Sequence, residues 1–174
     1  MSTILIGLGS KAQIGKDYAA AQLAKDHDVE RVAFADSLKK DLAYLFDKCG
    51  FNFSEILLVP ELKEKVRPLL VAYGQTMRIF EPEIWVRRAF DREFKSAITI
   101  VTDVRFPNEV AKIKEQGGVY IEIDTDVPPA NETEALYSPQ MLKLADAVVR
   151  NNFDGNYIRD LKAAIERLTG YSFY

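Results

Sequence analysis

Short apolar runs alternate with stretches of helical periodicity along most of the chain. The first run, residues 3–8, is rich in β-branched side chains and leads through a glycine-bearing loop into an alanine-rich stretch, which predicts strand, loop and helix. A second apolar run covers residues 31–35. The leucines of residues 36–50 then recur at helical spacing, which predicts a helix that Asp36 or Ser37 would cap.

The middle of the chain, residues 51–94, contains no convincing strand. We expect a helical insertion there, because its apolar positions recur at helical spacing. Residues that interrupt or end helices would divide it into pieces at Pro60, Pro68, Gly74 and Pro82.

The second half of the chain returns to alternating strands and helices. Its strongest strand, residues 96–103, is a nearly continuous apolar run, which is typical of a strand buried on both faces of a parallel sheet. The later elements are a helix at 107–116, a strand at 119–124, a polar lid loop at about 126–138, a short strand within 141–152 and a helix at 157–168. This alternation predicts an α/β fold, in which a parallel sheet of about five strands carries helices on both faces within one domain, residues 1–174.

Composition excludes several classes of protein. The chain has 174 residues, of which 48% are hydrophobic and 28% charged, as expected for a globular domain. No apolar stretch approaches the ~20 residues that span a bilayer, and the N-terminal apolar run precedes the first basic residue, unlike a signal peptide. We therefore expect a cytoplasmic protein. The single cysteine, Cys49, and the single histidine, His27, exclude internal disulfides, ordinary zinc sites and nucleophilic triads.

Charge argues for a small anionic ligand and against a nucleic-acid partner, and the lack of a spanning apolar stretch argues against a membrane partner. The formal net charge is −3, whereas general nucleic-acid binding depends on a basic face. Five arginines nevertheless fall in the central stretch of the chain, at Arg67, Arg78, Arg87, Arg88 and Arg105.

The loop after the first predicted strand has the composition of a phosphate cradle. It departs twice from the pattern GxxxxGK[ST], with Ser10 at the first glycine position and Asp17 at the Ser/Thr position. Backbone N–H groups, a helix N-terminus and the amine of Lys16 would bind terminal phosphates, and the carboxylate of Asp17 suits Mg²⁺. The alternative is a strand-to-helix turn in which the lysine is incidental.

A second polar motif ends the strongest strand. In doubly wound sheets, ligands bind beyond the carboxyl ends of the strands, where this motif would meet the loop of Lys16. Asp103 would face the metal there, and Arg105 would contact phosphate through a planar guanidinium. The alternative is that Asp103 caps a helix and Arg105 is solvated.

The arginines of the helical insertion are a third candidate group. At ~100° per residue, Arg67 and Arg78 share one face if their helix continues through Gly74. Arg87 and Arg88 leave the apolar face of their helix on different sides, so one of them would reach a phosphate while the other pairs with an acid. Surface arginines are also commonly just solvated.

Two weaker signals lie at the same predicted edge of the sheet. Asp36 and Lys39 stand at the start of the second helix, where capping alone explains Asp36. Asn151 and Asn152 follow the last strand, where their amides would contact a base or simply form a turn.

Taken in order, the segments GSKAQIGKD, FADSLKKDL, EIWVRRAF and VTDVRFPNEV resemble the phage-type deoxynucleoside monophosphate kinases over nearly the whole chain. The broader group, which includes phosphomevalonate kinases of the animal type, shares the GKD loop and the Asp-Arg element. The resemblance implies a P-loop NTPase-type three-layer fold with an acceptor-binding helical insertion at about 51–94. It leaves a homodimer open, and a phage origin would place the protein in an infected bacterial host.

The resemblance also implies a reaction: transfer of the γ-phosphate of ATP, with Mg²⁺, to a deoxynucleoside 5′-monophosphate. Donor phosphates would contact Ser10, Lys11, Ala12, Gln13, Ile14, Gly15, Lys16 and Asp17. Adenine would lie beside Asn151 and Asn152. The metal would be held by Asp17 and Asp103. Transfer would depend on Lys16, Arg88, Asp103 and Arg105. The acceptor would contact Asp36, Lys39, Arg67, Arg78, Trp85, Arg87 and Arg88.

The predicted lid departs from this family because it contains no arginine. Phosphoryl transfer to a phosphate oxygen needs positioning and charge neutralisation rather than a base, so the charge would have to be neutralised elsewhere. The available cations are Lys11, Lys16, Arg87, Arg88 and Arg105. Two other readings stay open: a kinase of another phosphorylated acceptor, such as phosphomevalonate or dephospho-coenzyme A, and a nucleotide-binding module without turnover.

Overall fold

The computed structural model describes residues 3–173, which contain a five-stranded parallel sheet. Its strands are β1 (Ile4–Gly9), β2 (Val29–Val32), β3 (Ile98–Val104), β4 (Val119–Asp124) and β5 (Ala147–Arg150). They lie in the order β2-β3-β1-β4-β5, and every neighbouring pair is parallel. The carboxyl ends of all five strands therefore share one edge, and the expected α/β fold is confirmed.

The chain divides into two compact units. The sheet unit comprises residues 1–33 and 93–174, and the helical unit comprises residues 34–92. The insertion expected at about 51–94 falls largely within the helical unit, which also takes in the preceding helix.

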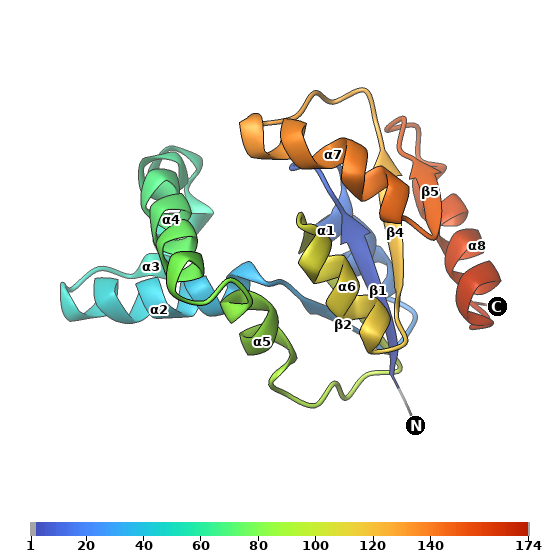
Figure 1. Cartoon of the computed structure of the whole chain (residues 1–174), viewed down its shortest axis with the longest axis horizontal. Coiled ribbons are helices and arrows are strands. Elements are labelled where there is room, and N and C mark those ends of the chain that lie inside the picture. Colours follow the sequence, from blue (N-terminus) through green and yellow to red (C-terminus); the bar gives the residue numbers. More distant parts are fainter. Residues whose placement is uncertain (1–2, 174) are drawn as a thin grey trace. The chain divides into compact units, whose positions relative to one another are not determined.

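Helices cover both faces of the sheet unit (Figure 1). Two of them, α1 (Lys16–Leu23) and α8 (Tyr157–Thr169), bury their apolar sides with the sheet in one continuous core. The other two, α6 (Pro107–Glu115) and α7 (Glu132–Leu144), lie against β4, and α6 also contacts β1. The result is the expected three-layer arrangement.

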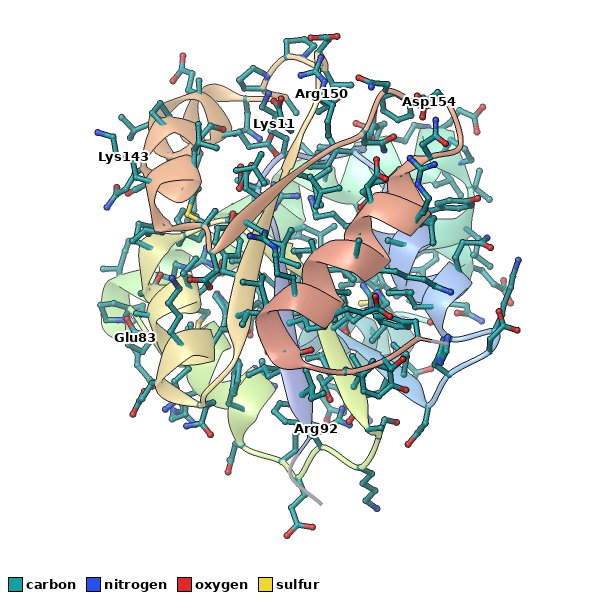
Figure 2. All side chains as sticks on the ribbon, turned by 90° about the vertical axis from the view of Figure 1, so that its right-hand side faces the viewer. Lys11, Glu83, Arg92, Lys143, Arg150 and Asp154 are labelled. Carbon is teal, nitrogen blue, oxygen red and sulfur yellow. The ribbon has the colours of Figure 1, made fainter. Side chains whose placement is uncertain are left out.

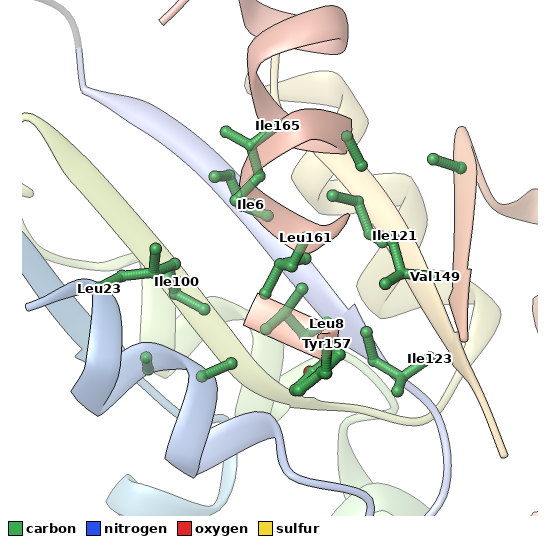
Figure 3. Close-up of a cluster of buried hydrophobic side chains, with 14 of the residues drawn as sticks. Ile6, Leu8, Leu23, Ile100, Ile121, Ile123, Val149, Tyr157, Leu161 and Ile165 are labelled. Atoms are coloured by element: carbon green, nitrogen blue, oxygen red, sulfur yellow. The ribbon is translucent and has the colours of Figure 1, made fainter. Parts of the chain in front are cut away.

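Alternate side chains of the central strands form the hydrophobic core that α1 and α8 cover (Figure 3). Ile6 and Leu8 of β1 are fully buried beside Ile100 of β3, where α1 and α8 cover them. Burying an aliphatic side chain of this size contributes ~1.5–3 kcal/mol, so these strands anchor the loops at the sheet edge. On the opposite face, a Cβ at Gly7 would lie 2.6 Å from the side chain of Ile113, so α6 packs directly on the backbone of β1.

The helical unit consists of α2 (Ala35–Lys48), α3 (Phe53–Leu58), α4 (Pro60–Phe80) and α5 (Ile84–Phe90). Trp85 is buried, and its indole N–H donates to the carbonyl of Gly74 across 3.0 Å. A Cβ at Gly74 would lie 2.8 Å from Leu38, so glycine permits α2 to approach α4 closely. None of the helices in residues 3–173 has the length and apolar character of a membrane span.

Several expected element boundaries are wrong. α4 runs unbroken through Pro68 and Gly74, because packing against α2 and Trp85 outweighs their helix-breaking tendency. The lid segment is not all loop: α7 begins at Glu132, with the side chain of Asn131 accepting from the N–H of Glu134. Helix α2 begins at Ala35, so Asp36 lies within its first turn instead of capping it.

Candidate active site

The loop between β1 and α1 turns into the helix at Gly15, which has a left-handed backbone with φ +88°. A Cβ at this position would lie 2.9 Å from the amide nitrogen of Asn151, so the fit excludes a side chain as well. That amide donates to the carbonyl of Ile14 across 3.0 Å. Asn151 therefore fastens the loop to the end of β5.

A buried carboxylate on β4 holds the beginning of the loop. Glu122 accepts hydrogen bonds from the backbone N–H of Ser10 at 3.1 Å, from its hydroxyl at 2.7 Å, and from the hydroxyl of Tyr120. Ser10 is 3% exposed, so its donors serve Glu122. Burial raises the pKa of Glu122 above its ordinary value, although these donors and the charge of Lys16 oppose the rise.

Lys16, the first residue of α1, lies buried within the loop and donates to the carbonyl of Lys11. Burial, together with the positive charge of Arg105, lowers the pKa of Lys16 to about 8. The carboxylates of Asp103, Glu134 and Glu122 partly offset this lowering, which places all of these charges near its amine. The structure therefore brings Lys16, Asp103 and Arg105 together, as the sequence predicted for one edge of the sheet.

Asp17 lies one residue further along α1 and joins it to two strands. Its Oδ1 accepts from Nε of Arg31 at 2.7 Å and from the hydroxyl of Thr102 at 2.8 Å. Burial raises the pKa of Asp17, but these hydrogen bonds outweigh that effect, so the net pKa is below the ordinary value. Asp17 is thus held as a carboxylate beside the end of β3. With Asp103, it provides the oxygen donors that suit Mg²⁺.

Arg105 follows β3 and is held by two acids. Its backbone N–H donates to Glu109, which is buried and caps the start of α6. Its guanidinium Nη1 donates to Oε1 of Glu134 on α7 at 3.0 Å. The same oxygen accepts the N–H of Ala12 in the loop at 3.1 Å. Arg105 and the loop are therefore joined through one carboxylate.

A cavity of about 310 Å³ opens beside the ends of β4 and β5, lined by Thr125, Asp126, Val127, Asn151, Asn152 and Phe153. Nζ of Lys11 donates to the carbonyl of Val127, one of the lining residues, at 3.1 Å. Arg150 pairs with Asp124 and Asp126 and donates to Asn152. Lys11 and Arg150 lie near the same end of the sheet unit (Figure 2). Asn151 and Asn152 thus both border the cavity.

In the helical unit, the two neighbouring arginines of α5 differ in their exposure and in the residues that they contact. Arg88 makes a two-point ion pair with Asp41 and lies over the ring of Trp85, 5.6 Å from its centre. Asp41 also accepts from the hydroxyl of Tyr73 at 3.0 Å. Arg87 also makes a two-point pair, with Glu81, but its side chain is 55% exposed against 32% for Arg88. Arg88 is therefore the less exposed of the two, and it has the additional contact with Trp85.

The remaining predicted acceptor residues are also placed on this unit. Arg67 and Arg78 share the continuous helix α4, which satisfies the condition for a common face. Arg67 pairs with Glu64 at 2.6 Å in solvent. Lys39 lies 4.0 Å from Asp36, one turn along α2.

Sequence reasoning missed four side chains of these sites: Asp41, Thr102, Glu122 and Glu134. Glu122 could have been identified from the sequence, because a charged residue inside a buried strand needs partners. The other three act through contacts between elements far apart in the sequence.

Comparison with family models agrees with a phosphate-handling site. A family model described as phosphomevalonate kinase matches residues 8–118, which include the loop, the helical unit, β3 and α6. No curated protein matches the chain. Among solved structures, TT1252 from Thermus thermophilus is similar at 15% identity and a TM-score of 0.44, over 98% of this chain and 100% of that one. A shikimate kinase from Bacteroides thetaiotaomicron is similar at 12% identity and a TM-score of 0.40, over 96% and 97%.

Proposed function

The chain belongs to the phosphomevalonate kinase family and is a P-loop kinase, and on this premise we propose that it transfers the γ-phosphate of ATP to a deoxynucleoside 5′-monophosphate. The observation that carries the proposal is the cluster of Lys16, Asp17 and Asp103 where the phosphate loop meets the end of β3. Such a cluster suits a metal-bound triphosphate, because it combines a buried amine with carboxylate oxygens.

The sheet unit would bind the donor nucleotide. The N-terminus of α1 and the amine of Lys16 would contact the terminal phosphates. Asp17 and Asp103 would hold Mg²⁺, which supplies positive charge to the phosphate oxygens when bound. The cavity beside Asn151 and Asn152 has space for the base, and Phe153 on its rim offers an aromatic face.

The reaction needs no catalytic base. A phosphate oxygen of the acceptor forms a new bond to the γ-phosphorus, the bond from that phosphorus to the β–γ bridging oxygen breaks, and ADP leaves. Lys16 and Arg105 would neutralise the charge on the transferring group. Because the lid segment contains no arginine and Nζ of Lys11 donates to the carbonyls of Thr125 and Val127, neutralisation of this charge would fall mainly on these two residues.

The helical unit would bind the acceptor. Arg88 is oriented by Asp41 and Trp85, as a bidentate phosphate contact requires. Tyr73 lies beside the same carboxylate and adds an aromatic side chain. An oriented guanidinium with aromatic neighbours suits a nucleotide, and the motifs of this unit resemble those of the deoxynucleoside monophosphate kinases.

A second candidate acceptor is phosphomevalonate, which the description of the matching family favours. Both acceptors present a phosphate monoester, so Arg88 would serve either of them. They differ in the remainder of the molecule, since only a nucleotide carries an aromatic base.

The test is acceptor-dependent release of ADP. Purified protein is mixed with ATP, Mg²⁺ and, separately, dAMP, dGMP, dCMP, dTMP or phosphomevalonate, with Lys16→Ala as the inactive control. We expect a nucleoside diphosphate product with one or more deoxynucleotides. ADP release with phosphomevalonate alone would move the assignment to the second acceptor, and ATP binding without any transfer would indicate a nucleotide-binding module.

A further inference from the structure

One carboxylate, that of Glu134, joins three segments of the sheet unit. Oε1 accepts from Nη1 of Arg105 at 3.0 Å and from the N–H of Ala12 at 3.1 Å. Oε2 accepts from the N–H of Ala130 at 2.9 Å. The phosphate loop, the segment after β3 and the segment before α7 therefore meet at one side chain.

The surroundings of this carboxylate fix its position. The side chain of Glu134 is 2% exposed, and its backbone N–H is capped by Asn131 at the start of α7. A buried carboxylate is tolerated when charged and hydrogen-bonded partners surround it, and here Arg105 supplies the charge. Glu134 therefore cannot move away from Arg105 without leaving a buried charge unpaired.

Arg105 differs from Glu134 in its exposure. Its side chain is 39% exposed, and a guanidinium carries five N–H donors, so holding one nitrogen leaves others for a phosphate. An unrestrained arginine would have to lose several rotatable angles on meeting the transferring group. Because Glu134 already holds Nη1 of Arg105, the side chain has lost part of its rotational freedom before the transferring group arrives.

We propose that Glu134 is a positioning residue for phosphoryl transfer, which holds Arg105 beside the phosphate loop in the orientation that the transferring group requires. This inference rests on the proposed function. It gives the lid segment a role although that segment has no arginine: the lid supplies an acid that orients an arginine from the end of β3.

The test compares Glu134→Gln with Glu132→Gln, a matched change at an exposed position in the same turn of α7. Misplacing a catalytic group by ~1 Å can cost ~10²-fold, so we expect kcat to fall by about 10- to 100-fold in Glu134→Gln. The KM for ATP should stay within about threefold, because Lys16 and the loop are retained. Glu132→Gln should match the wild type in both constants.

A double variant separates positioning from general damage. If Glu134 acts through Arg105, adding Glu134→Gln to Arg105→Gln should lower kcat by less than about twofold further. If Glu134→Gln does not fold, Glu134→Asp, which keeps the charge on a shorter side chain, replaces it and should give an intermediate kcat.

Two results would overturn the inference. The first is a wild-type kcat in Glu134→Gln, and the second is an additive loss in the double variant. If the wild-type kcat comes with tighter ATP binding, the carboxylate competes with phosphate for the same donors. A wild-type protein that transfers phosphate to no acceptor would instead overturn the proposed function, and the inference with it.

Discussion

Thr102 at the end of β3 donates its hydroxyl to Asp17 in the first turn of α1 across 2.8 Å. Asp17 stands where phosphate loops usually carry a serine or threonine that binds Mg²⁺. In this chain a threonine is present nearby, but on a neighbouring strand and directed at the carboxylate. If Asp17 holds Mg²⁺ as proposed, the pair would orient a charged metal ligand in place of a neutral one.

Replacing Asp17 should raise the Mg²⁺ concentration that activity requires more than it weakens nucleotide binding. In Asp17→Asn the negative charge is lost while the side chain keeps its size. We expect the Mg²⁺ concentration for half-maximal activity to rise by about tenfold or more, since Mg²⁺ prefers carboxylate oxygens. The measurement is a Mg²⁺ titration of ADP release at fixed ATP, with exposed Asp26→Asn as the control. If Asp17→Asn and Asp26→Asn need the same Mg²⁺ concentration for half-maximal activity, that result contradicts a metal role for Asp17.

Nucleotide binding should weaken in mild alkali. The pKa of Lys16 is lowered to about 8, so this amine loses its proton as the pH rises through that value. If only the protonated amine binds phosphate, the Kd for MgATP should rise roughly tenfold between pH 7 and pH 9. Calorimetry at several pH values measures it, and binding near pH 8 should take up a proton. Lys16→Arg, which stays charged, should show a flat profile, and a flat wild-type profile would be the contrary result.

The two adjacent arginines of α5 provide an internal comparison. Loss of a hydrogen bond to a charged group costs ~1.5–3 kcal/mol, so Arg88→Ala should raise the KM for the acceptor about tenfold or more. Arg87→Ala should change it by less than about twofold, because its partner Glu81 is in solvent. Both variants are assayed with the acceptor that the wild type uses, and thermal unfolding checks that Arg88→Ala folds. Equal effects of the two substitutions would remove the distinction between them.

Gly9 should not tolerate alanine. A Cβ there would lie 2.0 Å from the hydroxyl of Tyr120, which is bound to Glu122. Forcing extra atoms into a packed site costs ~1–3 kcal/mol, and the melting temperature should fall accordingly. Adding Tyr120→Ala removes the opposing ring, so the double variant should lose less stability than the two single changes added together. Simple additivity in denaturant unfolding would exclude the clash.

The parts of the fold that sequence predicts well are those governed by local pattern. β3 is identifiable because Ile98, Ile100, Val101 and Val104 place apolar side chains on both faces of the strand, as burial on both faces demands. α4 is predicted less well because Pro68 and Gly74 argue locally for a break, and only the contact with Leu38 and Trp85 explains its continuity. The start of α7 was hidden by the preceding prolines, although Asn131 and Glu134 have the spacing of a capping box.

The candidate site also has a part that the sequence predicts and a part that it does not. Lys16, Asp103 and Arg105 are predictable because parallel strands end at one edge, and the structure places these charges near one another. The partners that orient them are not predictable: Glu134 is 122 residues from Ala12, and Asp41 is 47 residues from Arg88. Contacts at such separations depend on how the helices pack, which leaves no local mark in the sequence.

The hydrogen bond from Asn151 also determines when the phosphate loop can reach its final structure during synthesis of the chain. The carbonyl it binds belongs to Ile14, 137 residues earlier, so the ribosome delivers the loop well before the residue that holds it. At ~5–20 residues per second, synthesis of the 137 intervening residues takes roughly 7 to 27 seconds, so the loop waits that long for the contact. A ligand stabilises only the state that it binds, so nucleotide can begin to protect the nascent protein from unfolding only after β5 has joined the sheet.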